Sequence, residues 1–81
     1  MREVQLENRI RVFRAERRWS QAELARRIGV SRKTISTIEV GRFVPSTIIA
    51  LLIAREFETS VEQVFWVADP SGRSGGPTDV P

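Results

Sequence analysis

The chain has 81 residues and contains neither Cys nor His, which excludes disulfides, thiolate or imidazole catalysis, and zinc sites built from those ligands. Its formal net charge of +3 conceals an asymmetry, because residues 1–55 hold 12 of the 13 Arg and Lys residues but only five of the ten acids. The lack of His and Cys leads us to expect no catalytic residue, metal or cofactor, and the basic segment suggests a polyanionic partner. The alternative is a solvated arginine-rich surface without a partner, and charge alone favours that alternative.

The first predicted helix carries Leu6, Ile10 and Phe13 at i, i+4 and i+7, which is the spacing of one buried stripe. A second helix is predicted after Ser20, because Ser20 and Glu23 have the spacing of a capping box. Leu24 and Ile28 form the inward face of this second helix.

A tight turn is predicted between the second helix and a third. Gly29 ends the second helix, since glycine tolerates the positive φ that helix ends favour, and Ser31 is the N-cap of the third. The third helix directs Ile35 and Ile38 inward, and Gly41 closes it.

A fourth helix opens at Pro45 and Ser46 and runs from about residue 46 to 57; its segment TIIALLIA is apolar nearly all round, which predicts burial within a bundle. Ser60 caps a short fifth helix with Val61, Val64 and Phe65 inward. Residues 68–81 are rich in Pro and Gly and are predicted to form a flexible tail beyond a domain of residues 1–67. Neither a secretory signal nor a run of about 18 apolar residues is present, so we expect a cytoplasmic protein without a membrane partner.

The second and third helices have the pattern of a helix-turn-helix unit. Counted from Gln21, the fourth, eighth, tenth, fifteenth and eighteenth residues are apolar: Leu24, Ile28, Val30, Ile35 and Ile38. The fifth residue is the small Ala25, and the ninth is Gly29 in the turn. These requirements follow from packing two short helices at about 90–120° across a tight turn. The alternative is a helical bundle with another function, in which two packed helices would share half of this pattern.

The segment NRIRVFRAERRWSQAELARRIGVSRKTISTIEVGRFVPS, followed by VEQVF, resembles the Cro/repressor-type (Xre-like) family of helix-turn-helix transcriptional regulators over about residues 8–66. The similarity is to short, stand-alone members of the family. It implies an all-α, five-helix lambda-repressor-like DNA-binding domain. It also implies that EVQL and FWVA can form a short terminal strand pair.

The resemblance implies a set of DNA-contacting residues. With Ile35 and Ile38 in the core, the side chains expected to read base edges are Arg32, Lys33, Ser36 and Thr37. Those expected to contact phosphate are Gln21, Thr34, Arg42 and Arg14. Arg14 and Glu39 match a family ion pair, with inconsequential surface pairing as the alternative. Phosphate contact without base readout remains the alternative for Arg32 and Lys33, and Trp19 is expected in the core rather than stacked on DNA.

The sequence departs from the family pattern in three ways, which involve four positions. Val40 replaces a common asparagine, and Glu58 replaces a common glycine. Ile48 and Leu52 stand where related proteins tend to carry charge, and as i, i+4 neighbours they form an apolar strip. We expect a homodimer interface that contains Ile48 and Leu52 together with Phe65 or Trp66. The alternative is that the terminal strands cover the strip.

The function expected from the resemblance is a sequence-specific DNA-binding transcriptional regulator, with repression favoured, that binds a pseudo-palindromic operator on double-stranded DNA as a dimer. One alternative is an antitoxin-like or restriction–modification controller-type protein that binds DNA together with a protein partner. Another is a basic amphipathic module on a membrane surface, for which the capped, tight-turn motif has no use.

Overall fold

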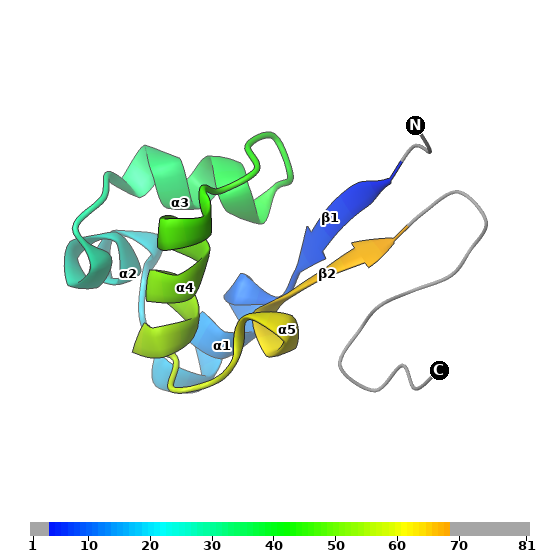
Figure 1. The fold of residues 1–81 in the computed structure, drawn as a ribbon. Coiled ribbons are helices and arrows are strands. Elements are labelled where there is room, and N and C mark those ends of the chain that lie inside the picture. The colour runs from blue at the N-terminus through cyan, green and yellow to red at the C-terminus, as the bar shows by residue number, and fades with distance from the viewer. Residues whose placement is uncertain (1–3, 69–81) are drawn as a thin grey trace.

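The computed structural model describes residues 4–68 and contains five helices and one strand pair (Figure 1). The elements in chain order are β1 (Gln5–Asn8), α1 (Ile10–Arg17), α2 (Gln21–Ile28), α3 (Arg32–Glu39), α4 (Thr47–Glu56), α5 (Val61–Val64) and β2 (Phe65–Ala68). This architecture confirms the predicted fold class. The predicted tail lies outside the described residues except for Ala68, which is the last residue of β2.

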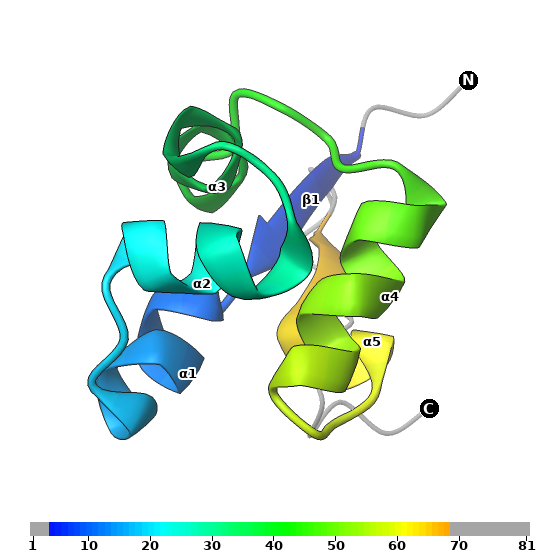
Figure 2. The same ribbon diagram turned by 90° about the vertical axis from the view of Figure 1, so that its left-hand side faces the viewer.

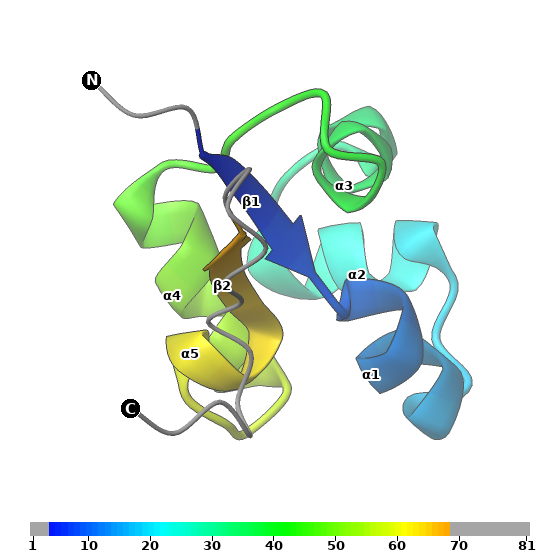
Figure 3. The ribbon, with the colours of Figure 1, turned by 90° about the vertical axis from the view of Figure 1, so that its right-hand side faces the viewer.

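The two strands join the ends of the described chain into an antiparallel pair. The register places Gln5 opposite Ala68 and Asn8 opposite Phe65. Figure 3 shows this pair along one side of the helices, with β2 beside α5 and β1 leading into α1. The strand pair was predicted, but β1 extends to residue 8, beyond the EVQL segment.

Leu6 was predicted on the first helix, and this was wrong. Leu6 lies in β1, and α1 begins only at Ile10. Leu6 nevertheless packs against the buried core from the strand. Leu6 in β1 and Ile10 in α1 face the same core, so their spacing in the sequence matched that of one helical stripe.

Serine side chains begin three of the helices as predicted. The Oγ atoms of Ser20, Ser31 and Ser46 accept hydrogen bonds from the backbone N–H groups of Glu23, Thr34 and Ile49 at 3.0, 3.1 and 3.2 Å. Each bond satisfies one N–H that has no partner within its helix. Only half of the predicted capping box forms, because the Glu23 carboxylate binds Arg26 and Arg27. Ser60 makes no side-chain cap bond at the start of α5.

The predicted turn between α2 and α3 is present. Gly29 has φ +79° and donates its N–H to the Ala25 carbonyl at 2.8 Å, which ends α2. Gly41, which also has a positive φ, follows the end of α3, whose C-cap is Val40. The short turn keeps α2 and α3 packed against each other at a steep angle (Figure 2).

The core takes buried residues from all five helices and from β2. They are Ile10, Leu24, Ala25, Ile35, Ile38, Ile53, Ala54, Phe57, Val64 and Phe65. The prediction that α4 is buried all round was wrong, because Ile48 and Leu51 are 69% and 54% exposed. Helices α2 and α5 pack against α4 and leave its outer face uncovered. No helix within residues 4–68 is long and apolar enough to cross a membrane.

Trp19 packs as predicted, within an aromatic cluster that joins α1 to the end of α4. Its ring stacks on Phe57 with the ring centroids 5.9 Å apart, and Phe13 stacks on Phe57 at 5.0 Å. The Arg27 guanidinium lies 4.0 Å from the Trp19 ring centroid, a cation–π contact. Arg17 donates to the Phe57 carbonyl at 2.7 Å. The cluster holds α1 and α4 together without placing Trp19 on an open surface.

Two helices end on a non-glycine residue in the left-handed region. Arg18, after α1, has φ +58°, and Glu58, after α4, has φ +59°. The N–H groups of Glu58 and Thr59 bind the Arg55 and Ala54 carbonyls at 2.9 and 3.0 Å, as at a glycine-terminated helix. Glu58 thus keeps the backbone geometry of the glycine common in related proteins, at the steric cost of a Cβ atom.

We predict that Glu58→Gly raises the free energy of unfolding by about 0.5–1 kcal/mol. Relief of the left-handed strain, roughly 1–2 kcal/mol, outweighs the greater entropy of glycine in the unfolded chain. Urea unfolding followed by circular dichroism measures the change. Glu58→Ala is the control, since it removes the charge but keeps the Cβ atom; an equal gain in both variants would show that the backbone is not the cause.

Candidate functional site

Helix α3 has one buried face and one open face. Ile35 and Ile38 are 0% and 2% exposed and anchor α3 on the core. Of the four predicted base-contacting side chains, Arg32 and Lys33 are exposed, and Ser36 and Thr37 are half-buried. In Figure 2, α3 is seen nearly end-on at the edge of the molecule, with α2 packed beside it. The helix therefore presents its cations away from the body.

Lys33 and Arg32 differ in how tightly they are held. No hydrogen bond or ion pair joins the Lys33 ammonium to another residue within 4–68. Arg32 Nη1 lies 3.3 Å from Gln21 Oε1 and donates to it, so the first residue of α2 restrains the first residue of α3. Lys33 remains adaptable, whereas Arg32 is oriented by its neighbour.

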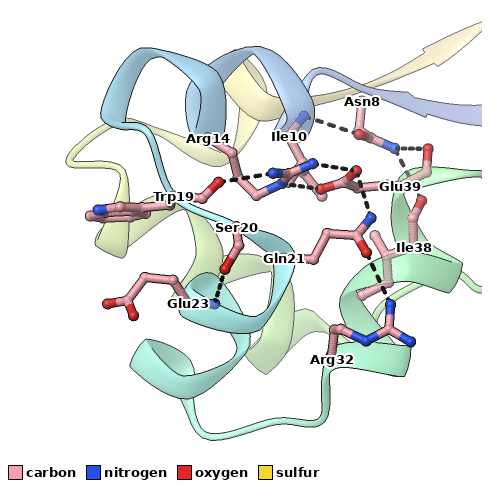
Figure 4. A network of polar contacts seen from close by, with 10 residues as sticks. All are labelled: Asn8, Ile10, Arg14, Trp19, Ser20, Gln21, Glu23, Arg32, Ile38 and Glu39. Atoms are coloured by element: carbon pink, nitrogen blue, oxygen red, sulfur yellow. Dashed lines mark hydrogen bonds and ion pairs between the residues drawn. The ribbon is translucent and has the colours of Figure 1, made fainter.

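The restraint on Arg32 continues into a part-buried polar network (Figure 4). Gln21 Nε2 donates to Glu39 Oε1 at 3.2 Å. Arg14 binds the same carboxylate in bidentate fashion, with Nε 2.6 Å from Oε2 and Nη2 3.1 Å from Oε1. Arg14 Nη1 donates to the Trp19 carbonyl at 2.9 Å. The network thus links α1, α2 and both ends of α3.

The predicted Arg14–Glu39 ion pair is confirmed, but it is not an inconsequential surface pair. The two side chains are only 14% and 7% exposed. Three of the five N–H groups of the Arg14 guanidinium donate within the protein, and one N–H group on each terminal nitrogen is left, so the phosphate contact that the sequence suggested stays a prediction. Arg14 acts as a structural tie to the end of α3.

The Thr37 hydroxyl is directed into its own helix. Its Oγ1 lies 2.9 Å from the Lys33 carbonyl and 3.0 Å from the Thr34 carbonyl, so its single proton is donated within α3. What Thr37 can offer to a ligand is its methyl group and the acceptor lone pairs of its hydroxyl. These groups suit a thymine methyl or a base amino group.

The loop after α3 is tied back to the helix. The N–H groups of Arg42 and Phe43 bind the Thr37 carbonyl at 2.9 and 3.2 Å. The exposed Arg42 side chain makes no hydrogen bond or ion pair with residues 4–68. At the start of α3, Thr34 gives its N–H to Ser31 Oγ, and its hydroxyl lies 2.9 Å from the same atom. Arg42 is therefore the more available of these two predicted phosphate contacts.

The cations of the last turn of α2 are paired with acids. Arg26 and Arg27 bind Glu23 at 2.6 and 2.8 Å, and Arg27 also binds Glu56 at 3.1 Å. The hydrogen bond from Arg26 is the main cause that lowers the pKa of the Glu23 carboxyl. These arginines therefore differ from Lys33 and Arg42, whose side chains have no acidic partner among residues 4–68.

Asn8 was assigned no role from the sequence, although it contacts the end of α3. Its amide bonds to the Ile38 carbonyl and to the Ile10 N–H (Figure 4). The signal available in the sequence was local: an asparagine shortly before a helix commonly bonds to a backbone group two residues ahead. The contact with α3 has no local signal.

The helix-turn-helix family model matches residues 10–64. An uncharacterized HTH-type transcriptional regulator of Bacillus subtilis, YgzD, is 38% identical over 64 residues, which cover 79% of this chain and 97% of that protein. A regulator of the same description from Archaeoglobus fulgidus is 43% identical over 60 residues, covering 74% of this chain and 84% of that protein.

Solved structures share the fold. A Bacteroides fragilis protein described as DNA-binding superposes on this chain with a TM-score of 0.67 and 28% identity, covering 75% of this chain and 98% of that chain. The clp gene regulator ClgR of Corynebacterium glutamicum gives a TM-score of 0.60 at 31% identity, covering 64% of this chain and 55% of that chain.

We predict that Arg14→Met and Glu39→Leu each lower the free energy of unfolding by about 3 kcal/mol, because each leaves a largely buried charge without its partner. The double variant should lose clearly less than the sum of the two, since it removes both charges. Urea unfolding of the unsubstituted protein, the two single variants and the double variant measures the four free energies of this double-mutant cycle. Additive losses would show that the two side chains do not depend on each other.

Proposed function

Since the chain belongs to the Cro/repressor-type (Xre-like) helix-turn-helix family of transcriptional regulators, we propose that it binds a pseudo-palindromic DNA operator as a dimer and represses transcription by occupying it. The observation that carries this proposal is the division of α3, with Ile35 and Ile38 in the core and Arg32 and Lys33 outward. The proposed DNA-binding unit comprises residues 1–67, the location is cytoplasmic, and the protein carries out no chemical step.

In this proposal α3 enters the major groove with its N-terminal end toward the base edges. Arg32 and Lys33 suit the O6 and N7 acceptors of guanine, and Thr37 and Ser36 contact the bases further along the helix. The bond from Arg32 to Gln21 supports base readout by Arg32, because a restrained guanidinium loses less freedom on binding. The alternative for Arg32 and Lys33 is that they contact phosphate without reading bases. The binding experiment described below distinguishes the two.

The proposed backbone contacts surround α3. Gln21 is the first residue of α2, so its N–H has no partner within the helix and can donate to a phosphate. Thr34 offers its hydroxyl, and Arg42 offers a guanidinium without a partner among residues 4–68. Neutralising phosphates releases counterions, which supplies affinity for any DNA sequence, and the base contacts then select the operator.

The proposed dimer interface centres on the outer face of α4. Val44 and Ile48 are each 69% exposed and Leu51 is 54% exposed; we call these three residues the apolar patch. Val44 and Leu51 also border an apolar hollow whose other lining residues include Leu6, Pro45, Ala50 and Phe65. Exposed apolar side chains beside an apolar hollow favour self-association, in which each copy fills the hollow of the other.

The four residues predicted for this interface differ in how exposed they are. Phe65 is 5% exposed and belongs to the core, so it contributes to the floor of the hollow rather than to an exposed edge. Leu52 is half-buried, and Leu51 takes its place in the exposed strip. Trp66 is half-buried, with the Arg9 guanidinium 4.7 Å from its ring centroid. Ile48 is exposed, which supports the proposed interface over the alternative that the strands cover the strip.

We predict that Lys33→Ala and Arg42→Ala impair DNA binding differently. Duplexes that the protein selects from a random pool define the operator, and fluorescence anisotropy at several salt concentrations compares it with scrambled DNA. Lys33→Ala should cost about 1–3 kcal/mol on the operator and relax preference at one base position. Arg42→Ala should weaken both duplexes alike and reduce the salt slope by about one. Equal effects of both variants on both duplexes would contradict the assignment.

We predict that Ile48→Glu converts the proposed dimer into a monomer at micromolar concentration, because it places a charge within the apolar patch. Sedimentation velocity measures the mass. Val12→Glu on α1 is the matched control, since Val12 is also exposed, at 51%, and the substitution adds the same charge. A dimer that persists in Ile48→Glu would place the interface elsewhere, and an unlike chain that co-purifies would favour the controller-type alternative.

A further inference from the structure

One side chain, Asn8, connects β1, α1 and α3 (Figure 4). Its Oδ1 accepts the Ile10 N–H at 3.0 Å, at the first turn of α1. Its Nδ2 donates to the Ile38 carbonyl at 3.1 Å and lies 3.5 Å from the Glu39 carbonyl. Ile38 and Glu39 are the last two residues of α3, and the Ile38 carbonyl also accepts the Gly41 N–H at 3.1 Å, so Asn8 adds a second, side-chain hydrogen bond to this end of the helix. Asn8 therefore caps α3 from thirty residues away in the sequence.

This amide holds the same end of α3 that the Arg14–Glu39 pair holds. Arg14 binds the side chain of the last helical residue, whereas Asn8 binds the backbone. The core contacts of Ile35 and Ile38 fix the depth of the helix, but apolar contacts are not directional. Hydrogen bonds are directional, so the two polar anchors together fix the rotation and tilt of α3.

Rotation and tilt decide whether side chains on the open face meet base edges. A base contact through two hydrogen bonds requires placement within about 0.5 Å and 10–20°. A long, flexible cation can still reach a phosphate after a small displacement, and phosphate contacts carry no sequence information. A loosened α3 should therefore lose selected DNA before it loses general affinity.

We propose that Asn8 is a positioning residue for base readout: it holds the last carbonyls of α3 so that Arg32 and Lys33 stay aligned with the base edges. The proposal rests on the function of α3 proposed above. Asn8 acts through the helix and makes no DNA contact of its own.

Two substitutions separate the contact with α1 from the contact with α3. Serine keeps an oxygen that can accept the Ile10 N–H, as such side chains do at turns, but it is too short to reach α3 and adds no charge. Aspartate keeps the acceptor, lacks the donor, and directs a negative charge at the carbonyl end of α3. Both variants preserve the start of α1 and remove the cap on α3.

The experiment compares the full chain with Asn8→Ser and Asn8→Asp at a temperature at which melting curves show all three to be folded. Anisotropy measures binding to the duplex selected by the unsubstituted protein and to scrambled DNA, at several salt concentrations. Asn8→Ser should weaken the selected duplex roughly tenfold and leave scrambled DNA and the salt slope nearly unchanged. Hydrogen exchange should accelerate in the last turn of α3 and not in the first turn of α1.

An unchanged preference in a folded variant, equal weakening on both duplexes, or failure of both variants to fold would overturn the proposal and leave Asn8 a purely structural residue. Lys33→Ala separates this outcome from failure of the proposed function. If Lys33→Ala lowers the preference and Asn8→Ser does not, α3 reads DNA without the help of Asn8. If the unsubstituted protein prefers no duplex, both proposals fall.

Discussion

The ion pair between Arg14 and Glu39 is the interaction on which the arrangement of the helices depends. It joins α1 to the last residue of α3, and Gln21 from α2 binds the same carboxylate. A charge buried without its partner is costly, so a placement of α3 that separates the pair is strongly disfavoured. A domain of this size buries only about 60% of the surface that its unfolded chain exposes. A directional polar contact thus supplies orientation that the small apolar core does not.

The same network connects structure to the proposed binding. Arg32 is held by Gln21, Gln21 by Glu39, and the backbone around Glu39 by Asn8. The residue proposed to read bases is therefore oriented by side chains from the two preceding helices and from β1. Lys33, one position further along the chain, lacks such a restraint among the described residues. A restrained arginine suits a fixed base contact, and an adaptable lysine suits small differences between sites.

The apolar residues of α4 lie on two faces of the helix, one buried and one exposed. Ile53 and Ala54 are buried against the domain, whereas Ile48 and Leu51 are exposed. A helix that is apolar nearly all round needs cover on every side, and residues 4–68 provide cover on one side only. The outer face of α4 is therefore the feature that most favours association with a second chain.

The sequence determined the elements whose signals are local. Serine caps, the positive φ of Gly29 and the spacing of Ile35 and Ile38 depend on near neighbours, so they predicted the helix starts, the turn and the buried face of α3. The family resemblance added the Arg14–Glu39 pair.

Tertiary structure decided whatever needs a partner distant in the sequence. Leu6 became a strand residue because β2, some sixty residues later, pairs with β1. The Arg14 side chain is only 14% exposed because its guanidinium binds Glu39 and the Trp19 carbonyl, and Phe65 is 5% exposed because it belongs to the core. Sequence periodicity shows which residues share a face, but only packing shows what covers that face.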